Sequence, residues 1–346
     1  MEKTIRILAL VLAVQVVLAV GLQFSGPTLS PATEAEPLVS KSSDQVSKIT
    51  IADAEDQQVK LKRTDSGWTL TDSGFPADPD KVSQLLKQLT GLSEGEVVAQ
   101  TESARERFKV AGENFKRRIT LHTGGQDPVR LYLGTSPGKD RVHARVEGRN
   151  PIQVVQFGTY DAPVKVADWQ DKGVLQIPSD RITGLQLNGL KLQRKESKQG
   201  ADKDGQTGQP AGWQASKTPE GKVLQPSAMR QLTQQLATLR FDSVLGAEQP
   251  GGYDWDQPVL ELTVQRGKED PVQYRLAKKS VKEDQTKYAL KSSTHKEYFS
   301  LATPTATQLI EAASAKALLG PEAEKESPDQ SGEQDKGRDQ APSSGS

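Results

Sequence analysis

Apolar and polar residues alternate along short stretches in two separate parts of the chain. One part begins with residues 46–51 and continues through residues 59–63 to Gly67-Trp68-Thr69-Leu70. The other begins with residues 182–187 and continues through residues 190–194 to Gly212-Trp213-Gln214. An alternating pattern is typical of strands with one face on a core and the other in water. The two parts therefore predict the same series of strands.

Each part then contains one amphipathic helix. Asp78 and Pro79 suit the N-cap and the first position of the earlier helix, and Pro226 begins the later one. The apolar positions of each helix fall on one face. They are Val82, Leu85, Leu86 and Leu89 in the first helix, and Met229, Leu232, Leu236 and Leu239 in the second. Pro79 and Leu89 precede their counterparts Pro226 and Leu236 by the same 147 residues.

This agreement predicts an internal repeat and an α+β fold. Each unit is expected to be an antiparallel, strand-rich sheet with one amphipathic helix. We assign residues 46–165 to the first unit and residues 166–320, with a polar insertion at 195–210, to the second. The predicted cores contain Trp68, Trp213, Leu85, Leu89, Leu232 and Leu236. For the two tryptophans, stacking on a ligand is the alternative.

The N-terminus predicts a membrane location. Residues 7–22 are apolar except for Gln15, Lys3 and Arg6 precede them, and no further Lys or Arg occurs before Lys41. By the positive-inside rule, the N-terminus is cytoplasmic and the bulk of the chain is periplasmic. We therefore expect residues 1–24 to form a single-pass anchor in a bacterial inner membrane; a cleaved signal peptide is the alternative.

Two segments lack the apolar residues that a core needs. Residues 25–45, rich in Pro, Ser, Thr and Ala, predict a flexible stalk. Residues 321–346 carry seven acidic and three basic side chains and predict a disordered acidic tail.

Composition excludes several classes of function. The 346 residues contain 45 Lys and Arg and 45 Asp and Glu, a balance that argues against nucleic acid as a partner. The chain has no cysteine, which excludes disulfides, thiolate metal sites and thiol catalysis. Its three histidines, His122, His143 and His295, lie far apart in sequence. We therefore expect no enzyme, cofactor or metal site, although Asp78 with Asp80, or Asp168 with Asp171, could form an acid–base pair.

One basic stretch is a candidate partner-binding patch. It consists of Arg105, Arg107, Lys109, Lys116, Arg117 and Arg118, with Phe108 and Phe115 between them. Such a patch could bind anionic lipid headgroups, an acidic glycan or an acidic partner. The alternative is a solvated helix and strand edge whose phenylalanines face the core. At the matching place, the second unit carries the acidic and aromatic sequence Tyr253-Asp254-Trp255-Asp256.

Residues 168–175, which join the two predicted units, have the sequence Asp-Trp-Gln-Asp-Lys-Gly-Val-Leu. Together with the anchor, the Gly-Trp strands and the leucine-rich helices, this connector resembles the bacterial family of domain of unknown function 4340. Gln170 stands where the family more often has Arg. The resemblance covers roughly residues 46–318 and implies an extracytoplasmic accessory protein, because family members are typically encoded beside ABC-type transporter genes resembling the gliding-motility export system.

Three functions follow as hypotheses. The first is a non-enzymatic, membrane-anchored periplasmic scaffold whose partners are the inner-membrane subunits of an ABC-type transport or export complex. The second is a module that binds a glycan or a lipid. The third is a hydrolase of the cell envelope, which would need a buried pair of carboxylates.

Overall fold

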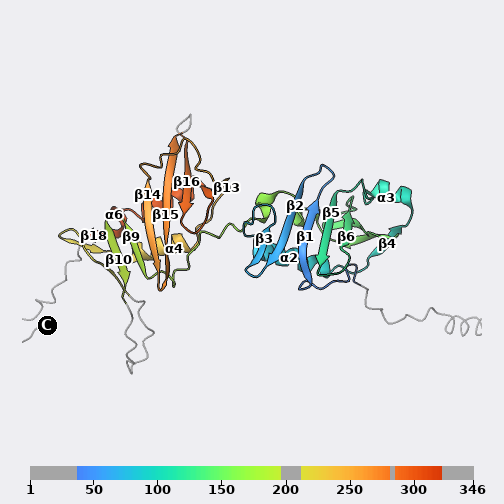
Figure 1. Cartoon of the computed structure of the whole chain (residues 1–346), viewed down its shortest axis with the longest axis horizontal. Coiled ribbons are helices and arrows are strands. Elements are labelled where there is room, and N and C mark those ends of the chain that lie inside the picture. The colour runs from blue at the N-terminus through green and yellow to red at the C-terminus, as the bar shows by residue number, and fades with distance from the viewer. Residues whose placement is uncertain (1–36, 196–211, 281–284, 322–346) are drawn as a thin grey trace, which may run out of the picture. The chain divides into compact units, whose positions relative to one another are not determined.

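The computed structural model describes residues 37–195, 212–280 and 285–321, which form two compact units. The first unit ends at Asp171 and the second begins at Lys172, a later boundary than residue 166. Both units are strand-rich antiparallel sheets with a few helices, as expected for an α+β protein (Figure 1).

The first unit contains one eight-stranded antiparallel sheet with the order β3-β2-β1-β5-β6-β7-β8-β4. Its elements are β1 (Val46–Ala52), β2 (Gln58–Thr64), β3 (Gly67–Leu70), α2 (Pro79–Thr90), β4 (Glu96–Ala99), α3 (Glu102–Phe108), β5 (Arg117–Thr123), β6 (Val129–Leu133), β7 (Arg141–Val146) and β8 (Ile152–Gln156), followed by the 3-10 helices η1 (Thr159–Asp161) and η2 (Val166–Trp169).

The second unit contains a sheet with the corresponding order β11-β10-β9-β14-β15-β16-β17-β13, and a separate pair β12-β18. Its elements are β9 (Gly184–Leu187), β10 (Leu190–Arg194), β11 (Trp213–Ala215), β12 (Lys222–Leu224), α4 (Pro226–Ala237), β13 (Ser243–Gly246), β14 (Leu260–Arg266), β15 (Glu269–Ser280), β16 (Thr286–Ser292), β17 (Tyr298–Leu301), α5 (Thr303–Ala312), α6 (Ala315–Leu318) and β18 (Leu319–Pro321).

The strand that follows the helix takes an equivalent place in both sheets. β4 and β13 do not join the strand that precedes the helix; each pairs with the strand that comes last along the chain in its own eight-stranded sheet, β8 or β17. Both pairings contain a register shift, at Val97–Ala99 and at Val244–Gly246. Such bulges are common at sheet edges, where they discourage pairing with another chain.

The core of each unit joins the helix to one face of the sheet. Leu85 and Leu89 of α2 are buried, as are Leu232 and Leu236 of α4. The strand positions that share the first core are the alternate ones, which are fully buried. They include Ile49, Ile51, Val59, Leu61, Ile119, Leu121, Leu131 and Leu133.

The two predicted core tryptophans are not in the cores. Trp68 and Trp213 are half-buried, because they lie on β3 and β11, the strands at the sheet edges, where a neighbour covers only one side. The buried indoles belong instead to Trp169, which is 1% exposed, and Trp255, which is 7% exposed.

The predicted stalk is wrong for residues 37–45. Leu38 and Val39 are buried, and the amide of Leu38 donates a 2.7 Å hydrogen bond to the carbonyl oxygen of Leu92. These two apolar side chains give the segment enough contact to pack on the first unit. At the other end, Pro321 is not part of the predicted tail. It belongs to β18 and pairs with Lys222 of β12.

Other predicted segments lie outside the described residues. They are the anchor at 1–24, the stalk as far as residue 36, nearly all of the insertion at 195–210 and the tail from residue 322. Among the helices that the structure describes, none has the length and apolar character needed to cross a membrane.

Candidate interaction surfaces

The six residues of the predicted basic patch lie on α3, in the segment after it and at the start of β5. Two of its arginines cover aromatic rings. The guanidinium carbon of Arg107 lies 4.7 Å from the ring centre of Phe108, and that of Arg118 lies 4.9 Å from the ring centre of Phe115. Cation–π contacts of this kind stabilise a fold by about 0.5–1 kcal/mol at exposed sites.

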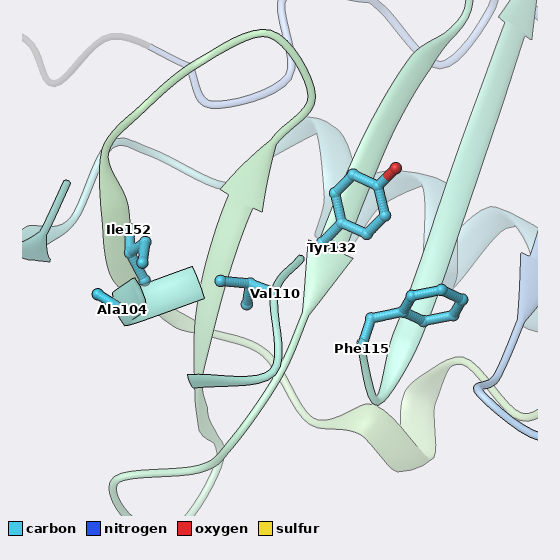
Figure 2. Packing of buried hydrophobic residues seen from close by; sticks show 5 residues of the cluster. All are labelled: Ala104, Val110, Phe115, Tyr132 and Ile152. Atoms are coloured by element: carbon cyan, nitrogen blue, oxygen red, sulfur yellow. The ribbon is translucent and has the colours of Figure 1, made fainter. Parts of the chain in front are cut away.

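The aromatic rings belong to a small second core beneath α3. Figure 2 shows its members Ala104, Val110, Phe115, Tyr132 and Ile152, with the rings of Phe115 and Tyr132 close together. Their ring centres are 5.8 Å apart. Arg145, which is buried, caps the Tyr132 ring at 4.7 Å and donates from Nε to the carbonyl oxygen of Val110 at 2.8 Å.

Two further arginines of the patch also make contacts within the unit. Arg105 donates to the side-chain oxygen of Asn150 at 2.8 Å. Arg117 donates from Nε to the carbonyl oxygen of Ala162 at 3.0 Å and lies 3.8 Å from the carboxylate of Asp53. These contacts tie α3 and β5 to their neighbours.

The remaining members, Lys109 and Lys116, are exposed. Lys109 ends α3 in the left-handed conformation, with φ of 55°, so its side chain leaves the helix axis. In the described residues, neither lysine side chain has a hydrogen bond or an ion pair. Four of the six predicted residues therefore support the fold, and binding of a partner by the patch stays a prediction.

The structure contains a second basic surface that the sequence did not predict. We call it the outer basic face, and it consists of Lys48 on β1, Lys60 and Lys62 on β2, His122 on β5 and Arg130 on β6. These residues alternate with buried core positions, so they lie on the side of the sheet that faces away from the core. Lys62 is exposed and the other four are partly exposed.

Strand pairing places these cations next to one another. Lys48 lies directly opposite Lys62 on one side and His122 on the other. Like charges at directly opposite positions destabilise a sheet, and two unit charges 4 Å apart repel by about 1 kcal/mol even in bulk water. Burial, followed by the charges of Lys48 and Arg130, holds the pKa of His122 below its ordinary value.

One carboxylate lies at the border of this face. Glu147 accepts a hydrogen bond from the Tyr132 hydroxyl at 2.9 Å and forms an ion pair with Arg130. Burial opposes ionisation of Glu147, but the hydrogen bonds from Arg130 and Tyr132 hold its pKa below the ordinary value. Of the described acidic residues, none forms a salt bridge with Lys48, Lys60 or Lys62.

The second unit carries neutral residues at most of the corresponding positions. The pair Lys48–Lys62 corresponds to Gly184–Gln193, as the matching registers show. His122 corresponds to Gln265, opposite Gly184, and Arg130 corresponds to Gln273, opposite Thr263. Only Lys60 keeps its charge, as Lys191.

The glutamines of the second unit line an open groove of about 880 Å³. Its polar side chains are four glutamines, Gln186, Gln193, Gln214 and Gln265, together with Thr183 and the basic Lys191, Arg194 and Lys195. Amide side chains both donate and accept hydrogen bonds. The groove therefore offers amide donors and acceptors to a hydroxyl-bearing molecule, and its three basic side chains add further donors.

One of the carboxylates considered for an acid–base pair, that of Asp78, has a structural role. The Asp78 side chain accepts hydrogen bonds from the amides of Asp80 and Lys81, each at 3.1 Å, and so caps α2. Asp168 and Asp171 lie in the connector. In the part of the chain that the structure describes, no group of three or more acidic or histidine side chains is arranged to hold a metal ion.

The first half of the connector is hydrogen-bonded to the first unit, and its second half is hydrogen-bonded to the second unit. Trp169 donates from Nε1 to the carbonyl oxygen of Pro163 at 2.8 Å and accepts from the amide of Asp78 at 2.8 Å, which ties it to the first unit. In the second unit, the Tyr274 hydroxyl donates to the carbonyl oxygen of Leu175 at 2.7 Å. Residues 168–175 are thus hydrogen-bonded to the first unit through Trp169 and to the second unit through Leu175.

A family model described as "Domain of unknown function (DUF4340)" matches residues 68–258. The match extends from β3 through the connector to the residues before β14, a narrower range than residues 46–318. No curated protein and no solved structure matches the chain.

Proposed function

The chain belongs to the DUF4340 family, whose function is unknown, and on this premise we propose that it is a non-enzymatic accessory or scaffold subunit of an ABC-type transport or export complex. It is anchored in the bacterial inner membrane by residues 1–24, and the two units lie in the periplasm. The inner-membrane subunits of the transporter are its partners.

One observation carries this proposal. The two units have the same strand order, yet corresponding positions on their open sheet faces carry lysine, histidine and arginine in one and mainly glutamine in the other. A fold that occurs twice in one chain, with different residues on its exposed sheet face, is suited to presenting two binding surfaces. The apolar segment 7–22, preceded by Lys3 and Arg6, supports the membrane location.

The experiment is a pulldown of the full-length chain in a mild detergent, followed by mass spectrometry. We expect transporter membrane subunits to be recovered with the native chain. Recovery should fall when residues 1–24 are replaced by an unrelated anchor, or when the two exposed lysines of the patch are reversed in K109E/K116E.

The matched control reverses two exposed lysines of the second unit, K217E/K268E. It makes the same change in net charge and should leave recovery unchanged. Arg105 and Arg117 are left intact, because their hydrogen bonds hold the fold. Recovery of the native chain without any transporter subunit contradicts the scaffold function.

The groove of the second unit favours a periplasmic glycan-binding module as a second candidate. Four glutamines, one threonine and three basic side chains line a groove of about 880 Å³, and the glutamine amides offer paired donors and acceptors to sugar hydroxyls. Saturable binding of an oligosaccharide in a glycan array, lost in Q186A/Q265A and kept in K217E, supports this function. Absence of binding to every glycan in the array contradicts it.

A further inference from the structure

We propose that the outer basic face of the first unit docks on the anionic headgroups of the membrane that holds the N-terminus. The proposal rests on the membrane anchor of the proposed function. It goes beyond that function by assigning a ligand to a surface that anchoring itself does not need. The face is the set Lys48, Lys60, Lys62, His122 and Arg130.

The geometry of the face suits a planar anionic surface. Neighbouring strands lie about 4.8 Å apart, and alternate residues on one strand lie about 7 Å apart. Lys62, Lys48 and His122 form one row across β2, β1 and β5, and Lys60 and Arg130 belong to the next row, with Thr50 and Thr120 between them. The three lysines and Arg130, joined by His122 when it is protonated, are therefore spread in two dimensions over one side of a sheet.

The fold does not require these charges. The second unit has Gly184, Gln193, Gln265 and Gln273 at four of the five positions and forms a sheet of the same order. Opposite placement of Lys48 and Lys62 opposes folding. A bound anionic surface would offset this repulsion, which gives the charges a role in binding.

The length of chain before the first unit favours the membrane over other anions. Residues 23–36 join the predicted membrane segment to Pro37, and even fully extended they reach only about 50 Å. The first unit is thus held close to the lipid surface, at a high effective concentration. Lysine and arginine side chains are attracted to anionic lipids once they come within a Debye length of the surface, about 8 Å at physiological salt.

The side chains around the face argue against a glycan as its ligand. Sugar sites usually offer an aromatic ring, but Tyr132, the ring on this side of β6, is only 3% exposed and is covered by Arg145. The face offers charge and the partly exposed Thr50 instead. An electrostatic contact with phosphate groups needs no aromatic platform.

The test places the full-length chain in lipid nanodiscs made of phosphatidylcholine alone or mixed with phosphatidylglycerol. Because the chain has no cysteine, T69C carries a single fluorophore opposite Lys62, and Q214C carries it at the corresponding position of the second unit. A quencher is attached to the lipid headgroups. We expect the T69C label to be quenched in the anionic discs and not in the neutral ones.

The variant K62Q/H122Q/R130Q installs the glutamines that the second unit already carries, so the sheet should still fold, which circular dichroism checks. It should abolish the quenching of the T69C label. About 0.5 M NaCl should do the same, because the Debye length then falls to roughly 4 Å. The Q214C label should respond to neither change.

Equal quenching of the T69C label in neutral and anionic discs, or quenching that survives the triple glutamine variant, overturns the proposal. Binding of soluble heparin or polyglutamate to the face, without a response to anionic discs, also overturns it and assigns the face to another polyanion. If the chain does not enter discs at all, the anchor itself fails, and the proposed function fails with it.

Discussion

Asp78 fixes the start of the first helix. Its side chain accepts from two amides that have no partner inside the helix, and Pro79 occupies the first helical position. In the second unit, Gln225 stands at the equivalent place and makes no side-chain capping bond. Of these two equivalent helices, α2 therefore has a side-chain cap and α4 has none.

Replacing Asp78 by Ala should lower the free energy of unfolding of the first unit by about 1 kcal/mol, because two helix amides lose their acceptor. Urea unfolding measures the change. The control D80A removes a carboxylate from the first helical turn but no cap, and should cost about 0.3–1 kcal/mol. A D78A variant as stable as the native chain would show that the cap contributes nothing.

His122 reports the charge of the outer basic face. Since Lys48 and Arg130 add to burial in lowering its pKa, the variant K48Q should raise that pKa, as NMR titration of the imidazole protons would show. K217Q, which removes a charge from the second unit, should leave the His122 pKa unchanged. An unchanged pKa in K48Q would contradict the electrostatic contact.

The same shift makes stability depend on pH. The folded state binds a proton at His122 less readily than the unfolded state, so stability rises with pH up to the ordinary histidine pKa of about 6.5 and falls as the pH drops below it. H122Q should therefore lose less in Tm than the native chain between pH 7.5 and pH 5.5. A steeper loss in H122Q would show that the sign is wrong.

The connector shows how one segment is shared between two sheets. Its first half is fastened by Trp169, and its second half by the hydroxyl of Tyr274 on β15. Burial strongly raises the pKa of Tyr274, which keeps the hydroxyl protonated and able to donate to the Leu175 carbonyl.

The variant Y274F should lower the free energy of unfolding of the second unit by about 1–3 kcal/mol, because the buried carbonyl of Leu175 loses its donor. Y160F is the comparison, since Tyr160 is exposed and its loss should have little effect. Hydrogen exchange followed by mass spectrometry would localise the change to residues 172–321. Faster exchange in the first unit as well would contradict this assignment.

The two cores lie in two separate units, which has a consequence for unfolding. Leu89 and Leu236 are both fully buried and stand at the same position of their helices. L89A should cost the first unit about 2–5 kcal/mol, and L236A should cost the second a similar amount, as expected for a cavity in a core.

Calorimetry should then show two transitions, with L89A lowering only one Tm and L236A lowering only the other. Hydrogen exchange would identify which unit each transition represents. The exposed substitution K217A should move neither. A single transition that both leucine variants lower equally would mean that the units unfold together.

The sequence alone determined the local features of the fold. The alternation at residues 46–51 and the spacing of Leu85 and Leu89 depend only on the periods of strands and helices, so they predicted the elements, the helix start at Pro79 and the α+β class. The constant offset between the halves reflects the same local patterns. The predicted membrane anchor also depends on the sequence alone.

Tertiary structure decided which strands pair and which side chains contact one another. The pairing of β4 with β8 joins segments more than 50 residues apart, and no local period specifies such a neighbour. The edge position of β3 left Trp68 half-buried, and the stacking of Arg118 on Phe115 gave a predicted binding residue a structural contact.

The outer basic face shows the same division. Lys48, Lys62, His122 and Arg130 are single charges in four alternating patterns, and the sequence shows each of them only as the polar side of a strand. Strand register brings them together, because residues far apart in sequence become neighbours only when the chain pairs. The kind of side chain at each position was thus determined locally, and the surface that these side chains form was decided by the fold.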